Sequence, residues 1–239
     1  MMKALRKIIG KLTRYALRAD SPFRSSDTYV AFLREKGVSV GSDVFFHQLT
    51  NINIDVSRPS LVTIGDKVRF TQGLTLLTHD YSWFVLLNKY DDMVGCSGKV
   101  SIGNNVFIGF NCTILAGTVV GDNVIIGANS LVKGDVQSDS VYGGVPARRI
   151  CSLRDFYANR IKSREGEISE YIKSLAPMYG RDIPDSLLAE EFTEFYSSET
   201  DDFDERIVRR QLKSRKDAVL QKNKPRFKSK LEFLDDQLK

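Results

Sequence analysis

The chain has 239 residues, of which 42% are hydrophobic, and a formal net charge of +5. No apolar run approaches the length needed to cross a membrane. The first residues mix charged with apolar side chains, which argues against a secretory signal peptide. Three cysteines, Cys96, Cys112 and Cys151, lack metal-ligand spacing and are typical of reduced thiols. We therefore expect a cytoplasmic protein with one main domain and appended segments.

Residues 1–39 are predicted to form an N-terminal helical cap. Within them, residues 1–18 have the pattern of a basic amphipathic helix, in which apolar side chains lie among lysine and arginine. Such a helix either covers the open end of the domain that follows, packs on a neighbouring subunit or lies on an anionic membrane surface. Peripheral contact of residues 1–20 with the inner face of the membrane therefore remains an open alternative.

From about residue 40 onward an apolar, mostly branched residue recurs at a spacing of six residues, or of twelve where Arg58 breaks the series. This period fits neither an α-helix nor a half-buried strand. It is typical of a hexapeptide β-helix, in which three short strands make one roughly triangular coil of about 18 residues. We expect the apolar residues to stack inside the coil and the glycines that follow them to supply strained backbone angles at the corners. The series consists of Val40, Phe46, Ile52, Ile64, Phe70, Leu76, Ile102, Ile108, Ile114, Val120, Ile126 and Val132.

The series is interrupted between Leu76 and Ile102, which are 26 residues apart, two more than a multiple of six. An excursion from the coil explains the shift, and we place it at about residues 81–99. His79 lies at the start of this excursion, where a side chain leaves the packed interior and borders a cleft. Because the pKa of a histidine lies near neutrality, His79 is a candidate general base. The repeat and the residues that follow it predict a β-helical domain over residues 40–150.

After residue 150 the apolar residues change to helical spacing, which predicts an α-helical extension over residues 151–239. Acidic residues are concentrated at 182–205 and basic residues at 206–230. We interpret these two blocks as partners across neighbouring helices or subunits. No recognition module for nucleic acid accompanies the basic block, so we expect no nucleic-acid partner. Part of the segment 221–239 is expected to be disordered.

The chain resembles the hexapeptide-repeat O-acetyltransferases that modify galactosides, maltose and polysaccharides. Three features carry this resemblance: the repeat over about residues 40–136, the run Thr78-His79-Asp80 before the excursion, and the run Gly-Gly-Val-Pro-Ala-Arg at residues 143–148. The resemblance implies a mainly β fold, a left-handed parallel β-helix with an excursion loop, an N-terminal helix and an α-helical C-terminal extension. It also implies a homotrimer.

For the chemistry, the resemblance implies an acetyl-CoA-dependent O-acetyltransferase in which His79 is the general base of a direct ternary-complex transfer. Asn51 matches an asparagine that helps to hold the acceptor and the oxyanion. Alternatively, Asn51 is a corner residue whose amide bonds to the neighbouring coil. Asp80 either orients His79 or only begins the loop.

The resemblance further implies that acetyl-CoA lies in a groove between two subunits. Arg148 and Arg149 are expected to pair with the nucleotide phosphates, because a guanidinium group binds such anions in a fixed geometry. Lys133 is a second candidate, although the chain reads Lys-Gly-Asp where the family often has Thr-Lys-Asp. The complete set of expected cofactor-binding residues is Phe110, Gly127, Ala128, Lys133, Arg148 and Arg149.

The expected acceptor is a sugar hydroxyl in a surface polysaccharide, its precursor or a nucleotide sugar. Tyr81 and Trp83, in the excursion, either stack on a sugar ring or anchor the loop on a neighbouring subunit. Two alternatives stay open, namely N-acetyl transfer to an amino sugar and a non-enzymatic assembly scaffold. No metal site is expected, because the two histidines per chain cannot supply the three that a β-helical carbonic anhydrase uses.

Overall fold

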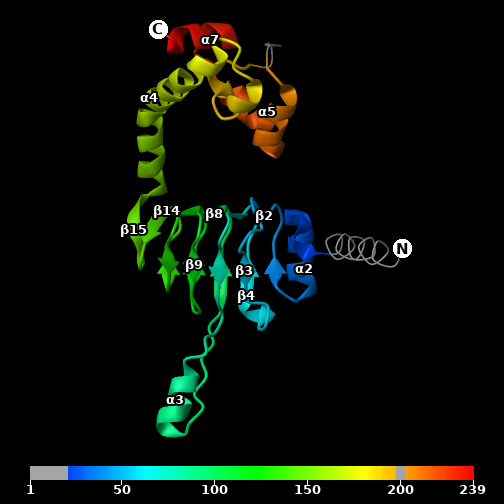
Figure 1. The fold of residues 1–239 in the computed structure, drawn as a ribbon, viewed down its shortest axis with the longest axis vertical. Coiled ribbons are helices and arrows are strands. Elements are labelled where there is room, and N and C mark those ends of the chain that lie inside the picture. Colours follow the sequence, from blue (N-terminus) through cyan, green and yellow to red (C-terminus); the bar gives the residue numbers. More distant parts are fainter. Residues whose placement is uncertain (1–20, 198–202) are drawn as a thin grey trace, which may run out of the picture. The chain divides into compact units, whose positions relative to one another are not determined.

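Short strands follow one another around a three-sided coil in the computed structural model, which describes residues 21–197 and 203–239 (Figure 1). The chain divides into two compact units at Tyr157 and Ala158. In the first unit each successive coil adds one strand to each of three sheets, and all pairs are parallel except the last. This arrangement is the predicted left-handed parallel β-helix.

Three sheets, called A, B and C, form the sides of the coil. Sheet A comprises β1 (Ser39–Val40), β4 (Val62–Ile64), β7 (Val100–Ile102), β10 (Val119–Val120) and β13 (Asp135–Val136). Sheet B comprises β2 (Phe45–Phe46), β5 (Arg69–Phe70), β8 (Val106–Ile108), β11 (Val124–Ile126), β14 (Ser140–Gly144) and the antiparallel β15 (Ala147–Ser152). Sheet C comprises β3 (Asn53–Ile54), β6 (Thr75–Leu76), β9 (Thr113–Ile114) and β12 (Leu131–Val132).

The strand register confirms the repeat but corrects its first coil. In later coils Leu131 pairs with Thr113, an offset of 18 residues. In the first coil Ile54, rather than the predicted Ile52, pairs with Leu76. The turn before β3 covers residues 47–52, whereas the equivalent turn before β6 covers only residues 71–74, so the inward series moves by two positions. Ile52 is buried as well, but it belongs to this longer turn.

The glycines that follow the inward residues are required for close packing and not for special backbone angles. A Cβ atom on Gly65 would lie 2.6 Å from the carbonyl oxygen of Gly103 in the next coil. The left-handed backbone at the corners is instead adopted by asparagines such as Asn111 (φ 54°) and Asn129 (φ 56°). Asparagine tolerates this conformation better than most residues. The expected role of the glycines was therefore wrong.

A short helix covers the first coil. The 3₁₀ turn η1 (Pro22–Arg24) precedes α2 (Ser26–Glu35). Ser25 caps the N-terminus of α2, because its hydroxyl accepts a hydrogen bond from the backbone N–H of Thr28. Tyr29 on α2 is 2% exposed and packs edge-on against Phe46 with 4.9 Å between ring centroids. This contact shields the apolar end of the stack from water. The predicted basic helix 1–18 and its membrane contact lie outside the described residues.

The predicted excursion is present and forms an arm that contains a helix, α3 (Trp83–Tyr90), which extends away from the coils (Figure 1). The arm is closed at its base, where the backbone N–H of Gly98 donates to the carbonyl of Thr78 at 2.8 Å. A Cβ atom on Gly98 would lie 2.5 Å from the backbone nitrogen of Gly117, so glycine allows the returning chain to approach the next coil. The helix within the arm was not predicted.

The second unit is helical, as the sequence indicates. Its elements are α4 (Leu153–Tyr179), of which residues from Ala158 belong to this unit, α5 (Glu205–Leu212), α6 (Lys216–Lys222), α7 (Lys230–Gln237) and the 3₁₀ turns η3 (Asp185–Leu187), η4 (Phe192–Glu194) and η5 (Lys213–Arg215). Part of segment 221–239 was expected to be disordered, but in the structure Phe233 and Leu234 of α7 are buried in the core. Among the described helices, none is long and apolar enough to span a membrane.

Candidate active site

A histidine–carboxylate pair lies where the arm leaves the β-helix. β3 and β6 are neighbours in sheet C, so the residues that follow these strands meet at one edge. Asp55 follows β3 and His79 follows β6, and Nδ1 of His79 lies 2.7 Å from Oδ2 of Asp55. Both side chains are largely buried, with 16% of His79 and 9% of Asp55 exposed.

The partners of Asp55 determine which nitrogen of His79 is available for chemistry. The Asp55 carboxylate also accepts hydrogen bonds from the backbone N–H and hydroxyl of Thr78 and from the backbone N–H and hydroxyl of Ser57. An ionised carboxylate only accepts hydrogen bonds, so Nδ1 of His79 carries the proton. In the neutral ring Nε2 then keeps its lone pair, which is the state a general base needs.

The charge on Asp55 is stabilised by the same contacts. Burial alone raises the pKa of this carboxyl, but the hydrogen bonds from Ser57, Thr78 and His79 outweigh it and leave the pKa well below its ordinary value. Asp55 is therefore ionised at neutral pH and holds the imidazole in one orientation. Asp55 was not among the residues that the sequence pattern predicted for the site.

The base of the arm surrounds His79 with further groups. The ring of Tyr81 lies edge-on to His79, with 5.5 Å between centroids, and Trp83 follows at 6.2 Å from Tyr81. Tyr81 is 71% exposed, so its ring is open to a ligand. Asp80 does not contact the imidazole through a hydrogen bond, because its carboxylate accepts from the backbone N–H of Ser82 at the start of α3. Of the two alternatives for Asp80, this contact fits the one in which it begins the loop.

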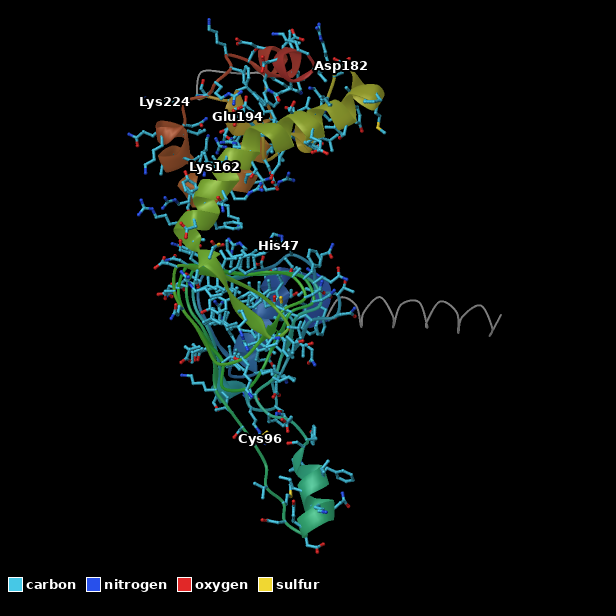
Figure 2. All side chains as sticks on the ribbon, turned by 90° about the vertical axis from the view of Figure 1, so that its left-hand side faces the viewer. His47, Cys96, Lys162, Asp182, Glu194 and Lys224 are labelled. Carbon is cyan, nitrogen blue, oxygen red and sulfur yellow. The ribbon has the colours of Figure 1, made fainter. Side chains whose placement is uncertain are left out.

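An exposed cysteine also lies beside this site. Cys96 is on the returning segment of the arm (Figure 2), and its sulfur accepts from the backbone N–H of Asp80 at 3.4 Å. The guanidinium of Arg58 donates to the carbonyl of Cys96 at 2.9 Å and helps to fix this segment. Cys112 is buried, and burial raises the pKa of its thiol, which makes it unreactive.

Four of the other predicted residues lie along a different line of the β-helix, which we call the B–C edge, formed by the turns from sheet B to sheet C. The turns there contain Asn51 in the first coil, Phe110 in the third coil and Gly127-Ala128 in the fourth. A Cβ atom on Gly109 would meet the nitrogen of Ala128 at 2.6 Å, and the N–H of Asn129 donates to the carbonyl of Phe110 at 2.7 Å. Asn51 is exposed and has φ 56°, which fits the alternative reading of a corner residue.

The two arginines extend this line. In the β14–β15 hairpin Arg148 pairs with Gly143, and Gly143 follows Tyr142, which pairs with Ile126 just before Gly127. Arg148 and Arg149 are both exposed. By contrast, Lys133 and His79 lie on the C–A edge, formed by the turns from sheet C to sheet A. Within one chain the predicted site residues are therefore divided between the two edges of sheet C.

Sequence reasoning missed Asp55 because the link between Asp55 and His79 depends on the two-residue shift of the first coil, which the six-residue period does not reveal. Cys96 was set aside because the path of the arm was unknown. For a metal, the described residues 21–197 and 203–239 contain no group of three or more His, Cys, Asp or Glu side chains placed to hold an ion.

Comparison with known proteins identifies the class of this fold and site. The family described as bacterial transferase hexapeptide (six repeats) matches residues 99–134. Protein CapG of Staphylococcus aureus is 37% identical over 143 residues, which cover 60% of this chain and 79% of CapG. The chain thus belongs to the hexapeptide-repeat acetyltransferases, a family of acyltransferases.

Two further relatives are similar over a shorter length. The galactoside O-acetyltransferase of Escherichia coli (strain K12) is 35% identical over 49% of this chain and 58% of its own length. The putative lipopolysaccharide biosynthesis O-acetyl transferase WbbJ of the same organism is 30% identical over 45% of this chain and 59% of its own length. The chain therefore spans somewhat more than half of these two relatives.

Proposed function

We propose that this protein is an acetyl-CoA-dependent O-acetyltransferase that acts on a sugar hydroxyl, with His79 as the general base. The 2.7 Å contact between Nδ1 of His79 and Asp55 carries the proposal, because it fixes the imidazole with Nε2 unprotonated. The side chain is still 16% exposed, so an acceptor hydroxyl has access to it. The position of the pair at the base of an aromatic arm suits a site for a bulky acceptor.

The proposed reaction is a direct transfer within a ternary complex. Nε2 of His79 removes the proton of the acceptor hydroxyl while the oxygen attacks the carbonyl carbon of the thioester. The tetrahedral intermediate then collapses, the C–S bond breaks and the proton on His79 passes to the CoA thiolate. A backbone N–H, assisted by Asn51, stabilises the oxyanion. Asp55 remains ionised throughout and stabilises the imidazolium that forms.

For acetyl-CoA, the B–C edge offers a continuous line of candidate contacts. Main-chain groups of Phe110 and of Gly127-Ala128 would line the pantetheine arm, and Arg148 and Arg149 at the last hairpin would pair with the phosphates. Lys133 would contribute from the C–A edge. These residues of the B–C edge lie in successive coils, so they form one line along the axis of the β-helix, and this supports the assignment.

A homotrimer explains how residues on two edges form one site. His79 lies on the C–A edge, whereas Phe110 and Ala128 lie on the B–C edge of the same chain. If three β-helices pack side by side, the C–A edge of one protomer can face the B–C edge of the next. The site is then completed by two chains, and the exposed apolar side chains of the arm gain a surface on which to pack.

The acceptor class is supported by the relatives and by the arm. The names of two relatives, the galactoside O-acetyltransferase and the putative lipopolysaccharide biosynthesis O-acetyl transferase WbbJ, connect those proteins with a galactoside and with lipopolysaccharide biosynthesis. Tyr81 and Trp83 beside His79 provide aromatic faces for a sugar ring, which explains why a sugar acceptor is favoured here. We therefore propose a hydroxyl of a surface polysaccharide, its precursor or a nucleotide sugar.

The test is a thiol-release assay with acetyl-CoA and a panel of free sugars, nucleotide sugars and oligosaccharides, in which wild type is compared with His79→Ala. Acceptor-dependent release that the variant loses is the expected result. Mass spectrometry locates the acetyl group, and rapid loss of that group in mild base identifies an ester. A base-stable product would instead establish N-acetyl transfer, and failure to bind CoA would favour a scaffold.

A further inference from the structure

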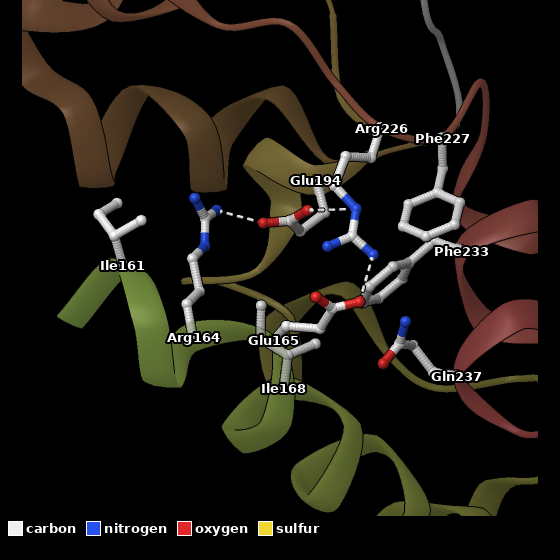
Figure 3. Close-up of a pocket in the computed structure, with 9 residues that line it drawn as sticks. All are labelled: Ile161, Arg164, Glu165, Ile168, Glu194, Arg226, Phe227, Phe233 and Gln237. Atoms are coloured by element: carbon white, nitrogen blue, oxygen red, sulfur yellow. Dashed lines mark hydrogen bonds and ion pairs between the residues drawn. The ribbon is translucent and has the colours of Figure 1, made fainter. Parts of the chain in front are cut away.

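The C-terminal unit contains a cavity that the proposed chemistry does not use. It has a volume of about 200 Å³ and is partly open to solvent, and Figure 3 shows the side chains that line it. α4 forms one wall, and η4, the segment before α7 and α7 itself form the others. The lining residues are Ile161, Arg164, Glu165, Ile168, Glu194, Arg226, Phe227, Phe233 and Gln237.

The walls of this cavity are held in place by hydrogen bonds at the backbone. The N–H of Phe227 donates to the carbonyl of Glu194 at 3.1 Å, and the side-chain amide of Asn223 donates to the carbonyl of Thr193 at 2.8 Å. Phe233, on the opposite side, is fully buried in the aromatic core. The cavity is therefore a preformed feature of this unit, as ligand sites usually are.

Charge in the cavity is balanced. Glu194 is 8% exposed and lies 2.7 Å from a guanidinium nitrogen of Arg164 and 3.8 Å from one of Arg226. Arg226 also pairs with Glu165 at 3.1 Å (Figure 3). Two guanidinium groups thus face two carboxylates. A phosphate or carboxylate ligand would have to displace an existing partner, whereas a neutral ligand would not.

One buried polar group in the cavity still has hydrogen-bonding capacity. Gln237 is 6% exposed, and its amide nitrogen donates to the carboxylate of the adjacent Asp236 at 3.2 Å. Within residues 21–197 and 203–239 its amide oxygen accepts no hydrogen bond, and Figure 3 shows the amide directed into the cavity. This amide oxygen is not fully enclosed, so it is open to the cavity and can accept a hydrogen bond from a ligand that donates one.

The lining of the cavity combines apolar side chains with polar groups. Ile161, Ile168 and Phe227 contribute carbon surface to a lining that also contains the amide of Gln237 and the carboxylate of Glu165. The guanidinium of Arg226 lies 5.2 Å from the ring centroid of Phe227, so one flat surface presents both apolar and polar atoms. A sugar ring has the matching character, since its C–H groups pack on apolar surface while its hydroxyl groups both donate and accept hydrogen bonds.

We propose that this cavity binds one neutral sugar residue of the acceptor glycan, away from the hydroxyl that is acetylated. The inference rests on the proposed function, because it assigns part of the acceptor to the C-terminal unit. The volume accommodates a single ring rather than a drug-sized ligand. Binding at this second point raises the effective concentration of a polymeric acceptor near the protein, so it acts on KM and leaves the chemical step unchanged.

The binding test uses saturation-transfer NMR on the full chain with the methyl glycosides of glucose, galactose and N-acetylglucosamine, and with inorganic phosphate as the anionic probe. Two variants separate binding from folding. Gln237→Met keeps the volume of the side chain and removes its amide, and Ile161→Trp enlarges a half-exposed lining residue so that the entrance is filled. Lys222→Gln, on an exposed position of α6, is the matched control. Circular dichroism verifies the fold of each variant.

We expect at least one methyl glycoside to bind, with about a tenfold loss of affinity in both cavity variants, because each removes or blocks one good contact. Lys222→Gln and His79→Ala should bind as wild type does. Absence of binding to every glycoside, undiminished binding in both cavity variants, or stronger binding of phosphate than of the glycosides would each overturn the inference.

Kinetics with an oligosaccharide acceptor separate this inference from the proposed function. If both hold, the cavity variants raise KM for the oligosaccharide and keep kcat, whereas His79→Ala loses kcat and keeps glycoside binding. Unchanged kcat in His79→Ala would refute the proposed chemistry while the NMR result still stands. Unchanged KM in both cavity variants would refute the link between the cavity and the acceptor.

Discussion

The β-helix and the C-terminal helical unit are stabilised in different ways. In the β-helix one register repeats, so aliphatic side chains such as Ile108 and Ile114 stack and the backbone supplies the hydrogen bonds. The helical unit has an aromatic core around Phe195 and Phe233, and ion pairs such as Lys230–Asp185 join its segments. Ion pairs are thus part of the scaffold in the helical unit. In the β-helix the backbone hydrogen bonds supply the scaffold; Arg69–Asp43 is a partly exposed pair between two coils, whereas the pair of His79 with Asp55 is largely buried beside the arm and is the candidate for chemistry.

The largest effect should follow from loss of the imidazole in the β-helix. His79→Ala is expected to lower kcat by roughly 10²–10⁴-fold, because a positioned general base contributes that much. His47→Ala is the matched control, since it removes the only other histidine, which lies near the first coil. Steady-state thiol release measures both. A variant at His79 that turns over at the wild-type rate would mean that the chemistry lies elsewhere.

A substitution inside the stack of the β-helix should destabilise the β-helix and leave the helical unit unchanged. Ile108 is fully buried between two coils, and Ile108→Ala is expected to lower the free energy of unfolding by about 2–5 kcal/mol through lost burial and a residual cavity. Val119→Ala, at a position that is 48% exposed, should change it by less than about 0.5 kcal/mol. Urea unfolding gives the totals, and hydrogen exchange read by mass spectrometry should show reduced protection in residues 39–152 only. Equal loss of protection in the helical unit would show that the two regions fold as one.

Asp55 should affect catalysis through the imidazole rather than through substrate. In Asp55→Asn the amide can donate to Nδ1, which moves the ring proton to Nε2 and removes the base. We expect kcat to fall by roughly 10²–10⁴-fold, in the range expected for His79→Ala, because the wrong tautomer leaves no base. KM for acetyl-CoA should stay close to wild type, and the pH profile of kcat should change. Asp80→Asn is the control and should leave both unaltered; an equal loss in that variant would assign the orienting role to Asp80.

The β-helix and the helical unit should lose stability at different pH values. Hydrogen bonds from Lys216 and Tyr196 lower the pKa of Glu205 in the helical unit to about 2, and the pKa of Asp55 is also held below its ordinary value. A carboxyl whose pKa is lowered on folding stabilises the protein fully above its unfolded pKa, near 4, and loses this contribution as the pH falls through the folded pKa.

Between pH 4 and pH 2 the helical unit should therefore lose protection first, because its ion pairs are more numerous and more exposed than the contacts of Asp55. Hydrogen exchange at stepwise lower pH measures this order. Glu205→Gln should be less stable than wild type at pH 7 and converge on it near pH 2. If the β-helix lost protection at a higher pH than the helical unit, the claim that ion pairs stabilise the helical scaffold would be wrong.

Features of the fold and the site could be predicted where they follow from a pattern along neighbouring residues, and not where they depend on contacts between residues far apart in the sequence. The coils, the excursion and the place of His79 follow from a six-residue period that can be read along the chain. Asp55 was missed because its contact with His79 depends on the length of one turn, and α3 was missed because the arm lies outside the repeat. In the helical unit, the contacts of Glu194 with Arg164 and Arg226 join segments far apart in sequence, and no periodic pattern reports them.

The smallest expected effect concerns Cys96, which the structure places beside His79 on the returning segment of the arm. In a direct transfer this thiol forms no bond with the acetyl group, so Cys96→Ser should keep kcat within about twofold of wild type. An acyl-enzyme route would behave differently, with loss of activity comparable to that of His79→Ala, ping-pong kinetics and an acetylated cysteine visible by mass spectrometry. Cys96→Ser therefore distinguishes direct transfer from an acyl-enzyme route, because only the acyl-enzyme route requires this sulfur.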